Sequence, residues 1–343
     1  MKTLRYIIFL QLWLCTVVLQ AQQPGGKIWL SYIDDSRLVS SLSIPGAHDA
    51  ATGEGFFLSC GIGKTQSMGL ASLWDCGVRA FDLRPAYCND ELGIYHGPMK
   101  TRVTLRDALD ILIAKIDENP GEFAIVLMRE ENEAENDSGR MLWPAALGEA
   151  IEALKERAAV FAPDITVGDM RGKILFMSRN AYTGTAKGAL VTGWTHSVTG
   201  CDNARIESYA GCGTAQLHVQ DFYAPVDKAK RHAKREAVLR FLDLAGSAPN
   251  SAWTINFLSG YSSRLLGVIP IATTTGYKRN ASVLHPVVID YLEGNAAGSV
   301  APLGIVFMDF AGADKVGGSI TRWKKFVTHG NHLVRLLIER NFK

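Results

Sequence analysis

Short, continuously apolar runs alternate along the chain with longer stretches whose apolar residues recur at helical spacing. The apolar runs predict strands at residues 38–44, 78–83, 93–96, 123–128, 173–178, 216–221, 253–258 and 303–309. Helices are predicted at residues 105–118, 144–160, 226–245, 283–294 and 331–341. Strands that are apolar throughout, with helices between them, are typical of a parallel sheet whose outer face is covered.

The helix expected from Leu105 carries the clearest signals for its ends. Its apolar residues fall at positions 105, 108, 109, 112, 113 and 116, which form one face of a helix. Thr104 is the expected N-cap, and Asn119, Pro120 and Gly121 end the helix.

Composition and length favour one large domain. The 343 residues are 47% apolar and 20% charged, and this excludes a disordered chain. About eight strands separated by helices, with no linker, repeat or low-complexity segment, predict a single TIM-type (β/α) barrel over residues 22–343.

The N-terminus has the pattern of a secretory signal peptide. Lys2 and Arg5 precede an apolar run at 6–19, and Ala21 stands before a polar stretch. The alternative is a membrane anchor, but Gln11 interrupts the run, which is shorter than the ~20 residues that a bilayer span needs. We therefore expect residues 1–21 to be removed and the protein to be secreted or periplasmic.

Removal of this segment changes the charge and the cysteine count. The whole chain has 36 basic and 34 acidic residues, and Lys2 and Arg5 account for the excess, so the remainder is neutral and no nucleic-acid partner is expected. Five cysteines remain, at 60, 76, 88, 201 and 212. Cys201 and Cys212 are the best local candidates for a disulfide, whereas Cys76 and Cys88 suit buried positions. No C-x-x-C spacing indicates a zinc site.

Polar and charged side chains follow most of the predicted strands at the point where each strand ends. They are His48, Asp49, Asp82, Arg84, His96, Arg129, Arg179, Asp221, Tyr223 and Asp309. The catalytic residues of a β/α barrel come from the C-terminal ends of its strands, where the loops form one mouth. The sequence therefore predicts that these side chains share a single site.

The same residues stand in motifs that resemble the catalytic X region of bacterial phosphatidylinositol-specific phospholipase C. The motifs are SIPGAHD at 43–49, GVRAFDLR at 77–84, YHG at 95–97, VLMRE at 126–130, RGKILFMSR at 171–179, VQDFY at 219–223 and GIVFMD at 304–309. They occur in the family's order over residues 30 to 340, and the first two are the most specific. The family's distorted TIM barrel agrees with the fold predicted above.

The resemblance implies a reaction and assigns roles in it. In this family the inositol 2-hydroxyl attacks its own phosphodiester, which releases diacylglycerol and leaves inositol 1,2-cyclic phosphate. By resemblance His48 is the general base and His96 the general acid, a pair suited to proton transfer near neutral pH. Asp309 is then the partner of His48, and Asp49 is the partner of His96.

The remaining roles concern charge and substrate recognition. Arg84, oriented by Asp82, would grip the phosphate where eukaryotic relatives use calcium, so the resemblance implies an enzyme without a metal or other cofactor. Arg129, Arg179, Asp221 and Tyr223 match the inositol-binding positions. Arg129 departs from the lysine of the well-known members, which keeps the charge but changes the donor geometry.

The expected partner is phosphatidylinositol at a membrane interface, or a glycosyl-phosphatidylinositol anchor, met by a peripheral monomer. Phe56 to Leu58 and residues 265–271 are candidates for bilayer contact, and core packing is the alternative for both. The basic helix at 226–240 can meet anionic lipid or simply be a solvated outer helix.

Two other functions remain open at this point. A glycerophosphodiester phosphodiesterase shares the barrel, but its metal-binding Glu-x-Asp pair would fall on Ala80 and Asp82, so one ligand is missing. A non-catalytic inositol-lipid-binding module is the other alternative, although binding alone does not require both His48 and His96.

Overall fold

A computed structural model describes residues 26–57, 63–131, 137–195, 201–223, 230–260, 263–266, 269–272, 274–294, 301–317 and 325–343. The predicted signal peptide at 1–21 and Cys60 lie outside these residues.

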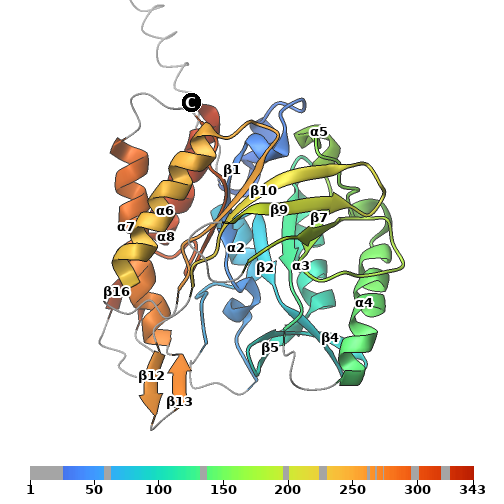
Figure 1. The fold of residues 1–343 in the computed structure, drawn as a ribbon, viewed down its shortest axis with the longest axis horizontal. Helices are drawn as coiled ribbons and strands as arrows, with labels where there is room; N and C mark the ends of the chain where they lie inside the picture. Colours follow the sequence, from blue (N-terminus) through green and yellow to red (C-terminus); the bar gives the residue numbers. More distant parts are fainter. Residues whose placement is uncertain are drawn as a thin grey trace, which may run out of the picture.

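Nine of the described strands close into a barrel in the order β1-β14-β11-β10-β9-β8-β7-β6-β2 (Figure 1). Their bounds are β1 Ser43–Ala47, β2 Ala80–Leu83, β6 Ala124–Met128, β7 Ile174–Ser178, β8 Ala189–Thr192, β9 Cys201–Ser208, β10 Thr214–Gln220, β11 Trp253–Phe257 and β14 Gly304–Met308. The TIM-like α/β fold expected from the sequence is confirmed.

The expectation of an entirely parallel sheet is wrong at one strand. β9 runs antiparallel to both β8 and β10, so the barrel is mixed. Its side chains alternate, with Ala204 and Ile206 buried and Asn203 and Arg205 exposed. This alternation is typical of a hairpin with one face in water, and it explains why no continuous apolar run marks the strand in the sequence.

A second departure concerns residues 93–96, which form a strand outside the barrel. β4 Glu91–His96 lies between β3 Pro85–Cys88 and β5 Met99–Thr104 in a separate antiparallel sheet. The apolar segment at 38–44 is divided, because Val39–Ser41 form a 3-10 turn before β1 begins. His96 therefore reaches the barrel mouth from a hairpin, whereas His48 follows a barrel strand directly.

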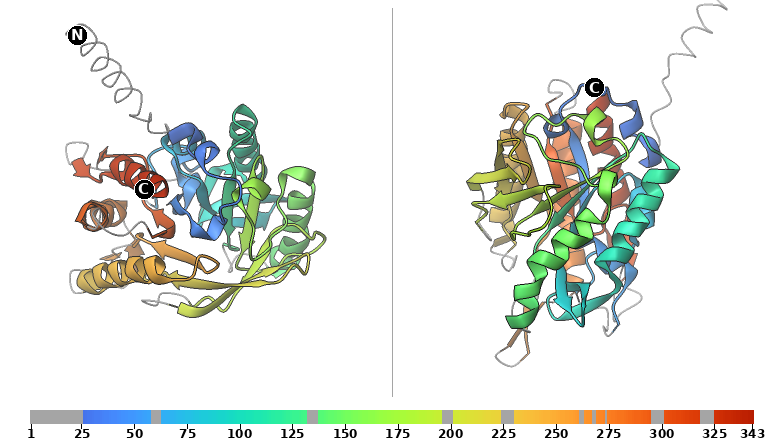
Figure 2. Two further views of the ribbon diagram at one scale, coloured as in Figure 1. Left: turned by 90° about the horizontal axis from the view of Figure 1, so that it is seen from above. Right: turned by 90° about the vertical axis from the view of Figure 1, so that its right-hand side faces the viewer.

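The helices pack around the outside of the strands. They are α2 Leu70–Cys76, α3 Leu105–Glu118, α4 Asp137–Glu152, α5 Val167–Met170, α6 Lys230–Ser247, α7 Thr274–Gly294 and α8 Gly330–Glu339. The 3-10 turns besides Val39–Ser41 are Gly26–Ile28, Leu30–Tyr32, Ala50–Glu54, Lys155–Arg157 and Arg340–Phe342. α6, α7 and α8 lie on one side of the barrel, with α3 and α4 on the opposite side (Figure 1). Seen from above, the described helices leave the β9–β10 ribbon uncovered (Figure 2).

Local sequence signals account for the start of α3. The Thr104 hydroxyl accepts from the Asp107 backbone N–H, and the Asp107 carboxylate accepts from the backbone N–H of Thr104. This capping box satisfies two of the amide groups that a helix leaves unpaired at its N-terminus.

Helix α6 is not simply a solvated basic helix. Lys230, Arg235 and Arg240 are exposed, but Lys234 is fully buried and donates to the Phe257 carbonyl at 2.6 Å and to Gln220 Oε1 at 3.1 Å. Burial lowers the pKa of Lys234 to about 7. This lysine ties α6 to the ends of β10 and β11.

The expected Cys201–Cys212 disulfide is not present, because Cys212 is a free thiol. Cys201 begins β9, whereas Cys212 stands in the turn after the strand has ended at Ser208. An eight-residue strand at ~3.3 Å per residue separates the two backbones far beyond disulfide reach. Cys76 and Cys88 are also free and are half-buried.

Two small antiparallel sheets project from one end of the barrel. One is the β3–β5 sheet, and the other is the hairpin of β12 Ser263–Leu266 and β13 Ile269–Ala272 (Figure 1). β15 Lys315–Gly317 and β16 Lys325–Val327 form a further hairpin. Within the described part of the chain, no helix has the length and apolar character needed to cross a bilayer.

Candidate active site

The C-terminal ends of the barrel strands surround a pocket of about 220 Å³. Seven of the ten residues singled out in the sequence line it, namely His48, Arg84, His96, Arg129, Arg179, Asp221 and Tyr223. The other three, Asp49, Asp82 and Asp309, are buried and contact the lining residues. The structure thus brings together all ten residues.

His48 is held at the end of β1 by its backbone and by its ring. The backbone N–H donates to the Met308 carbonyl at 3.0 Å, which continues the pairing of β1 with β14. Nδ1 lies 2.8 Å from Asp309 Oδ1, and the ring meets the edge of Phe257 at 5.9 Å. The side chain therefore has one fixed orientation.

The guanidinium of Arg84 determines which nitrogen of His48 carries the proton. Arg84 Nη2 lies 2.8 Å from His48 Nε2 and, having only hydrogens to offer, must donate there. Nε2 is consequently an acceptor, and Nδ1–H donates to Asp309. In this tautomer the unprotonated nitrogen of His48 is the one that faces the pocket, as a general base requires, and Arg84 occupies its lone pair.

Burial and charge both favour the neutral form of His48. Burial, followed by the positive charge of Arg84, lowers the pKa of this histidine well below its ordinary value. Burial also raises the pKa of Asp309 well above its ordinary value, with the charge of Asp49 acting in the same direction. The imidazole is thus neutral before the reaction.

Arg84 itself is fixed by two carboxylates. Its Nη2 donates to Asp82 Oδ2 at 3.1 Å, and its Nε forms an ion pair with Asp49 Oδ1 at 2.7 Å. Burial opposes ionisation of Asp82, but Arg84 and the other hydrogen-bonding partners outweigh it and hold its pKa below the ordinary value. The guanidinium is therefore a charged, oriented group at the pocket wall.

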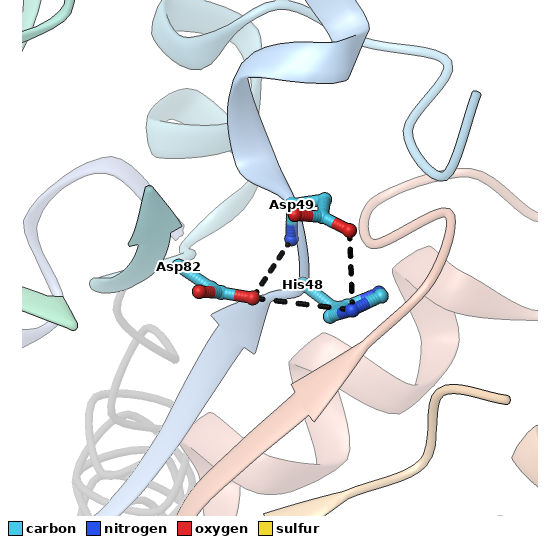
Figure 3. A group of neighbouring side chains, drawn as sticks. All are labelled: His48, Asp49 and Asp82. Carbon is cyan, nitrogen blue, oxygen red and sulfur yellow. Dashed lines mark hydrogen bonds and ion pairs between the residues drawn. The ribbon is translucent and has the colours of Figure 1, made fainter. Parts of the chain in front are cut away.

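His48, Asp49 and Asp82 form a cluster whose potential ligand atoms all lie within 4.8 Å of one another (Figure 3). The Asp49 backbone N–H donates to Asp82 Oδ2 at 3.2 Å and links the turn after β1 to strand β2. One histidine and two carboxylates are suitable ligands for a divalent cation. Arg84 contacts all three side chains, however, so a cation is already supplied by the chain.

His96 reaches the same carboxylate from the β4–β5 hairpin. Its Nδ1 lies 2.6 Å from the Gly63 carbonyl, and its Nε2 lies 3.4 Å from Asp49 Oδ2. His48 Nε2 lies 3.3 Å from the same oxygen. The two histidines therefore flank one point, although one comes from the barrel and the other from a hairpin outside it.

The opposite side of the pocket is lined by arginine and aromatic side chains. Arg179 lies over the Trp194 ring at 4.2 Å and is 3.8 Å from Asp221 Oδ2, which also accepts from Trp194 Nε1 at 3.0 Å. Burial lowers the pKa of Arg179 to about 10, so it remains charged at neutral pH. Arg129 is held by Glu131 Oε2 at 2.7 Å.

A second pocket of about 360 Å³ adjoins the first. Arg129 and Arg179 line both pockets, and Trp194, Asn180 and Thr192 line only the second. A ligand held between the two arginines has room to extend in this direction.

Sequence comparison finds two bacterial relatives that carry the same name. A 1-phosphatidylinositol phosphodiesterase of Listeria monocytogenes is 29% identical over 163 residues, 45% of this chain and 49% of that protein. The matched part is thus about half the length of that relative. A protein of the same name from Staphylococcus aureus is 25% identical over 296 residues, 83% of this chain and 88% of that protein. No family model matches the chain.

Two solved structures have a similar fold. A pentafluorophenylalanine variant of phosphatidylinositol-specific phospholipase C from S. aureus superposes with a TM-score of 0.68 at 21% identity, over 93% of this chain and 98% of that chain. The phospholipase of the same name from L. monocytogenes gives 0.66 at 22% identity, over 92% and 99% of the two chains. The chain is thus similar in sequence to bacterial 1-phosphatidylinositol phosphodiesterases and in fold to bacterial phosphatidylinositol-specific phospholipases C.

Four further residues of the site were not predicted from the sequence. Glu131, Trp194, Phe257 and Tyr277 each contact a predicted site residue. Glu131 stands two positions after Arg129, the spacing that places side chains on one side of an extended chain, so its signal was present. Tyr277 lies on α7, and no pattern at a strand end marks it.

Proposed function

We propose that the protein is a metal-independent phosphatidylinositol-specific phospholipase C. In the proposed reaction the inositol 2-hydroxyl attacks the phosphorus of its own phosphodiester. The new O–P bond replaces the bond to the glycerol oxygen, and the products are diacylglycerol and inositol 1,2-cyclic phosphate. The observation that carries the proposal is the placement of two imidazole Nε2 atoms at 3.3 and 3.4 Å from the same Asp49 oxygen, beside Arg84.

His48 is the proposed base. Its Nε2 takes the proton of the 2-hydroxyl, and the Nδ1–H of the resulting imidazolium donates to Asp309, 2.8 Å away, which holds the ring in place. The neutral resting state that follows from the lowered pKa of His48 is the state that a base needs.

His96 is the proposed acid. Its Nε2 faces the same point of the pocket as His48, and it gives a proton to the glycerol oxygen as that oxygen leaves the phosphorus. Its Nδ1 lies against the Gly63 carbonyl, which fixes Nδ1 as a donor and orients the ring.

Arg84 provides the positive charge for the phosphate. A guanidinium can donate to two phosphate oxygens at once, and the carboxylates of Asp49 and Asp82 hold it in place before substrate arrives. The proposed mechanism uses no metal ion or other cofactor, since Arg84 lies at the cluster of His48, Asp49 and Asp82 that would otherwise suit one.

The inositol ring is proposed to lie against Arg129, Arg179, Asp221 and Tyr223. The two arginines offer donors to ring hydroxyls, Asp221 offers an acceptor, and Tyr223 offers a flat surface. The adjoining pocket lined by Trp194 favours an inositol that carries a polar substituent, and we extend the proposed substrates to glycosyl-phosphatidylinositol anchors on this ground.

The protein is proposed to act as a secreted or periplasmic monomer that contacts the membrane only peripherally. Phe57 is 63% exposed beside the β5 strand, and the β12–β13 hairpin projects from the same end of the barrel as the β3–β5 sheet (Figure 1). This arrangement would bring the mouth of the barrel to the lipid surface.

The test of the proposed function is cleavage of vesicles that contain either phosphatidylinositol or phosphatidylcholine, with release of diacylglycerol as the readout. We expect the wild-type protein to release diacylglycerol from phosphatidylinositol vesicles and not from phosphatidylcholine vesicles. We expect His48→Ala to release none from either. Cleavage of glycerophosphoinositol to glycerol 3-phosphate, dependent on added divalent metal, would instead identify a glycerophosphodiester phosphodiesterase. Binding of phosphatidylinositol vesicles without any cleavage would indicate a binding module.

A further inference from the structure

Tyr277 is a buried tyrosine at the wall of the active-site pocket. It belongs to α7, is 5% exposed, and lines the pocket together with His96. Its hydroxyl lies 3.4 Å from His96 Nε2, and the two rings are 5.7 Å apart at an angle of 56°. Tyr277 takes no part in the proton transfers proposed for His48 and His96.

The position of His96 explains why such a contact matters. The β4–β5 pairing shifts register between Gly93 and Tyr95, so the strand that carries His96 is irregular just before this residue. A side chain on an irregular hairpin outside the barrel needs partners from other elements to keep its orientation. The Gly63 carbonyl provides one at Nδ1, 2.6 Å away.

The Asp49 carboxylate, which lies near Nε2 of His96, also contacts two other side chains. Its Oδ2 lies 3.3 Å from His48 Nε2 as well as 3.4 Å from His96 Nε2, and its Oδ1 is paired with Arg84 at 2.7 Å. The carboxylate is thus shared among three basic groups. Tyr277 adds an uncharged oxygen at 3.4 Å from the same nitrogen of His96.

The tyrosine is itself rigidly placed. Its ring belongs to a small apolar cluster with Ala281, Phe310, Ala313, Val316 and Phe326. Phe310 directly follows Asp309, and its backbone N–H donates to the Thr65 carbonyl at 2.7 Å. The cluster therefore connects α7 to the strand end that carries the partner of His48.

We propose that Tyr277 is a positioning residue for the general acid His96, and this inference rests on the proposed function. Before substrate binds, the tyrosine oxygen accepts a hydrogen bond from His96 Nε2–H, and this contact holds the ring where the same N–H can turn to the leaving glycerol oxygen once substrate is present. The proton passes from His96 to the glycerol oxygen as the P–O bond breaks, and Tyr277 keeps its own proton throughout.

The test uses two substrates whose leaving groups differ in how much they need an acid. Phosphatidylinositol expels an alkoxide, which needs a proton, whereas 4-nitrophenyl inositol 1-phosphate expels a phenolate that is stable without one. Loss of one hydrogen bond to a charged group costs about 1.5–3 kcal/mol, or about 10- to 100-fold in rate. We expect Tyr277→Phe to lower kcat on phosphatidylinositol by about this factor and kcat on the aryl ester by less than about twofold, with KM unchanged.

Tyr291→Phe is the matched control, because Tyr291 lies on the same helix and donates to Asp243 at 2.8 Å. It is expected to leave both rates unchanged. The ratio of the two rates does not depend on the folded fraction, so partial unfolding of Tyr277→Phe cannot imitate the result. In a His96→Ala background, Tyr277→Phe is expected to cause no further loss on phosphatidylinositol.

Equal losses on both substrates, or no loss on phosphatidylinositol, would overturn the role of Tyr277. A wild-type protein that cleaves neither substrate would overturn the proposed function instead, so the two failures are distinguishable.

Discussion

Arg84 Nη2 donates a hydrogen bond to His48 Nε2 at 2.8 Å, so the residue proposed to bind phosphate also covers the proposed base. A phosphate that takes over this N–H frees the lone pair of Nε2 for the inositol 2-hydroxyl. Substrate binding and exposure of the base are thereby coupled through a single hydrogen bond.

The first prediction concerns the geometry of Arg84. Arg84→Lys keeps the charge but loses the fork that reaches His48, Asp49 and Asp82 together. We expect kcat/KM on phosphatidylinositol to fall by at least ~10²-fold, since an oriented donor to the reacting phosphate is lost. Near-normal activity of Arg84→Lys would mean that charge alone is enough.

The second prediction concerns the two histidines. His48→Ala and His96→Ala are each expected to lower kcat by at least ~10²-fold, the usual contribution of a general acid or base. His332→Ala is the control, because His332 is 36% exposed at its side chain and its ring pairs with Glu293, and neither residue lines the pocket. If either active-site variant is folded and retains its rate, the assigned role is wrong.

The third prediction concerns pH. Burial raises the pKa of Asp49 to about 6, although Arg84 and His96 oppose this effect. Its ionised form holds Arg84 and His96, whereas the lowered pKa of His48 keeps that base neutral at the same pH. We expect kcat/KM to decrease as pH falls through about 6, and this limb to move to lower pH in Asp49→Asn. An unchanged acid limb in Asp49→Asn would contradict the assignment.

The fourth prediction concerns stability. His285 is fully buried with Nδ1 at 2.6 Å from the Thr328 carbonyl, and burial lowers its pKa from 6.5 to about 4. Between these pH values the unfolded chain binds more protons than the folded chain. The contribution of His285 to the free energy of unfolding is therefore fully present above pH 6.5 and is lost as pH falls toward 4. The contribution is about 3 kcal/mol over this window.

Urea unfolding at pH 7 and pH 4.5 measures this contribution, with His285→Gln as the comparison. The glutamine keeps a hydrogen-bond donor but does not titrate, so the difference in stability between the two pH values is expected to shrink. An identical pH dependence in the variant would show that His285 does not supply it.

Much of the barrel was predictable because its strands are buried on both faces and therefore apolar throughout. β6 and β7 fell within one residue of the predicted segments for this reason. β9 was not predicted, since its exposed face carries Asn203 and Arg205 and breaks the apolar run. Its antiparallel direction depends on a turn at 209–213 that closes a hairpin, which periodicity alone does not reveal.

The site was predictable where residues follow barrel strands and unpredictable where they come from elsewhere. His48, Arg129 and Asp309 are placed by strands that end at one mouth. Tyr277 comes from a helix far along the chain, and its contact with His96 depends on how α7 packs against the β14 end. Such a contact is a property of tertiary packing and has no local sequence pattern.

The most direct test of the central claim is phosphorus NMR of phosphatidylinositol cleavage in excess EDTA. The account predicts that inositol 1,2-cyclic phosphate appears first and at an undiminished rate, because Arg84 supplies the charge at the phosphate. Loss of all activity on chelation, restored by a divalent cation, would contradict the metal-independent mechanism.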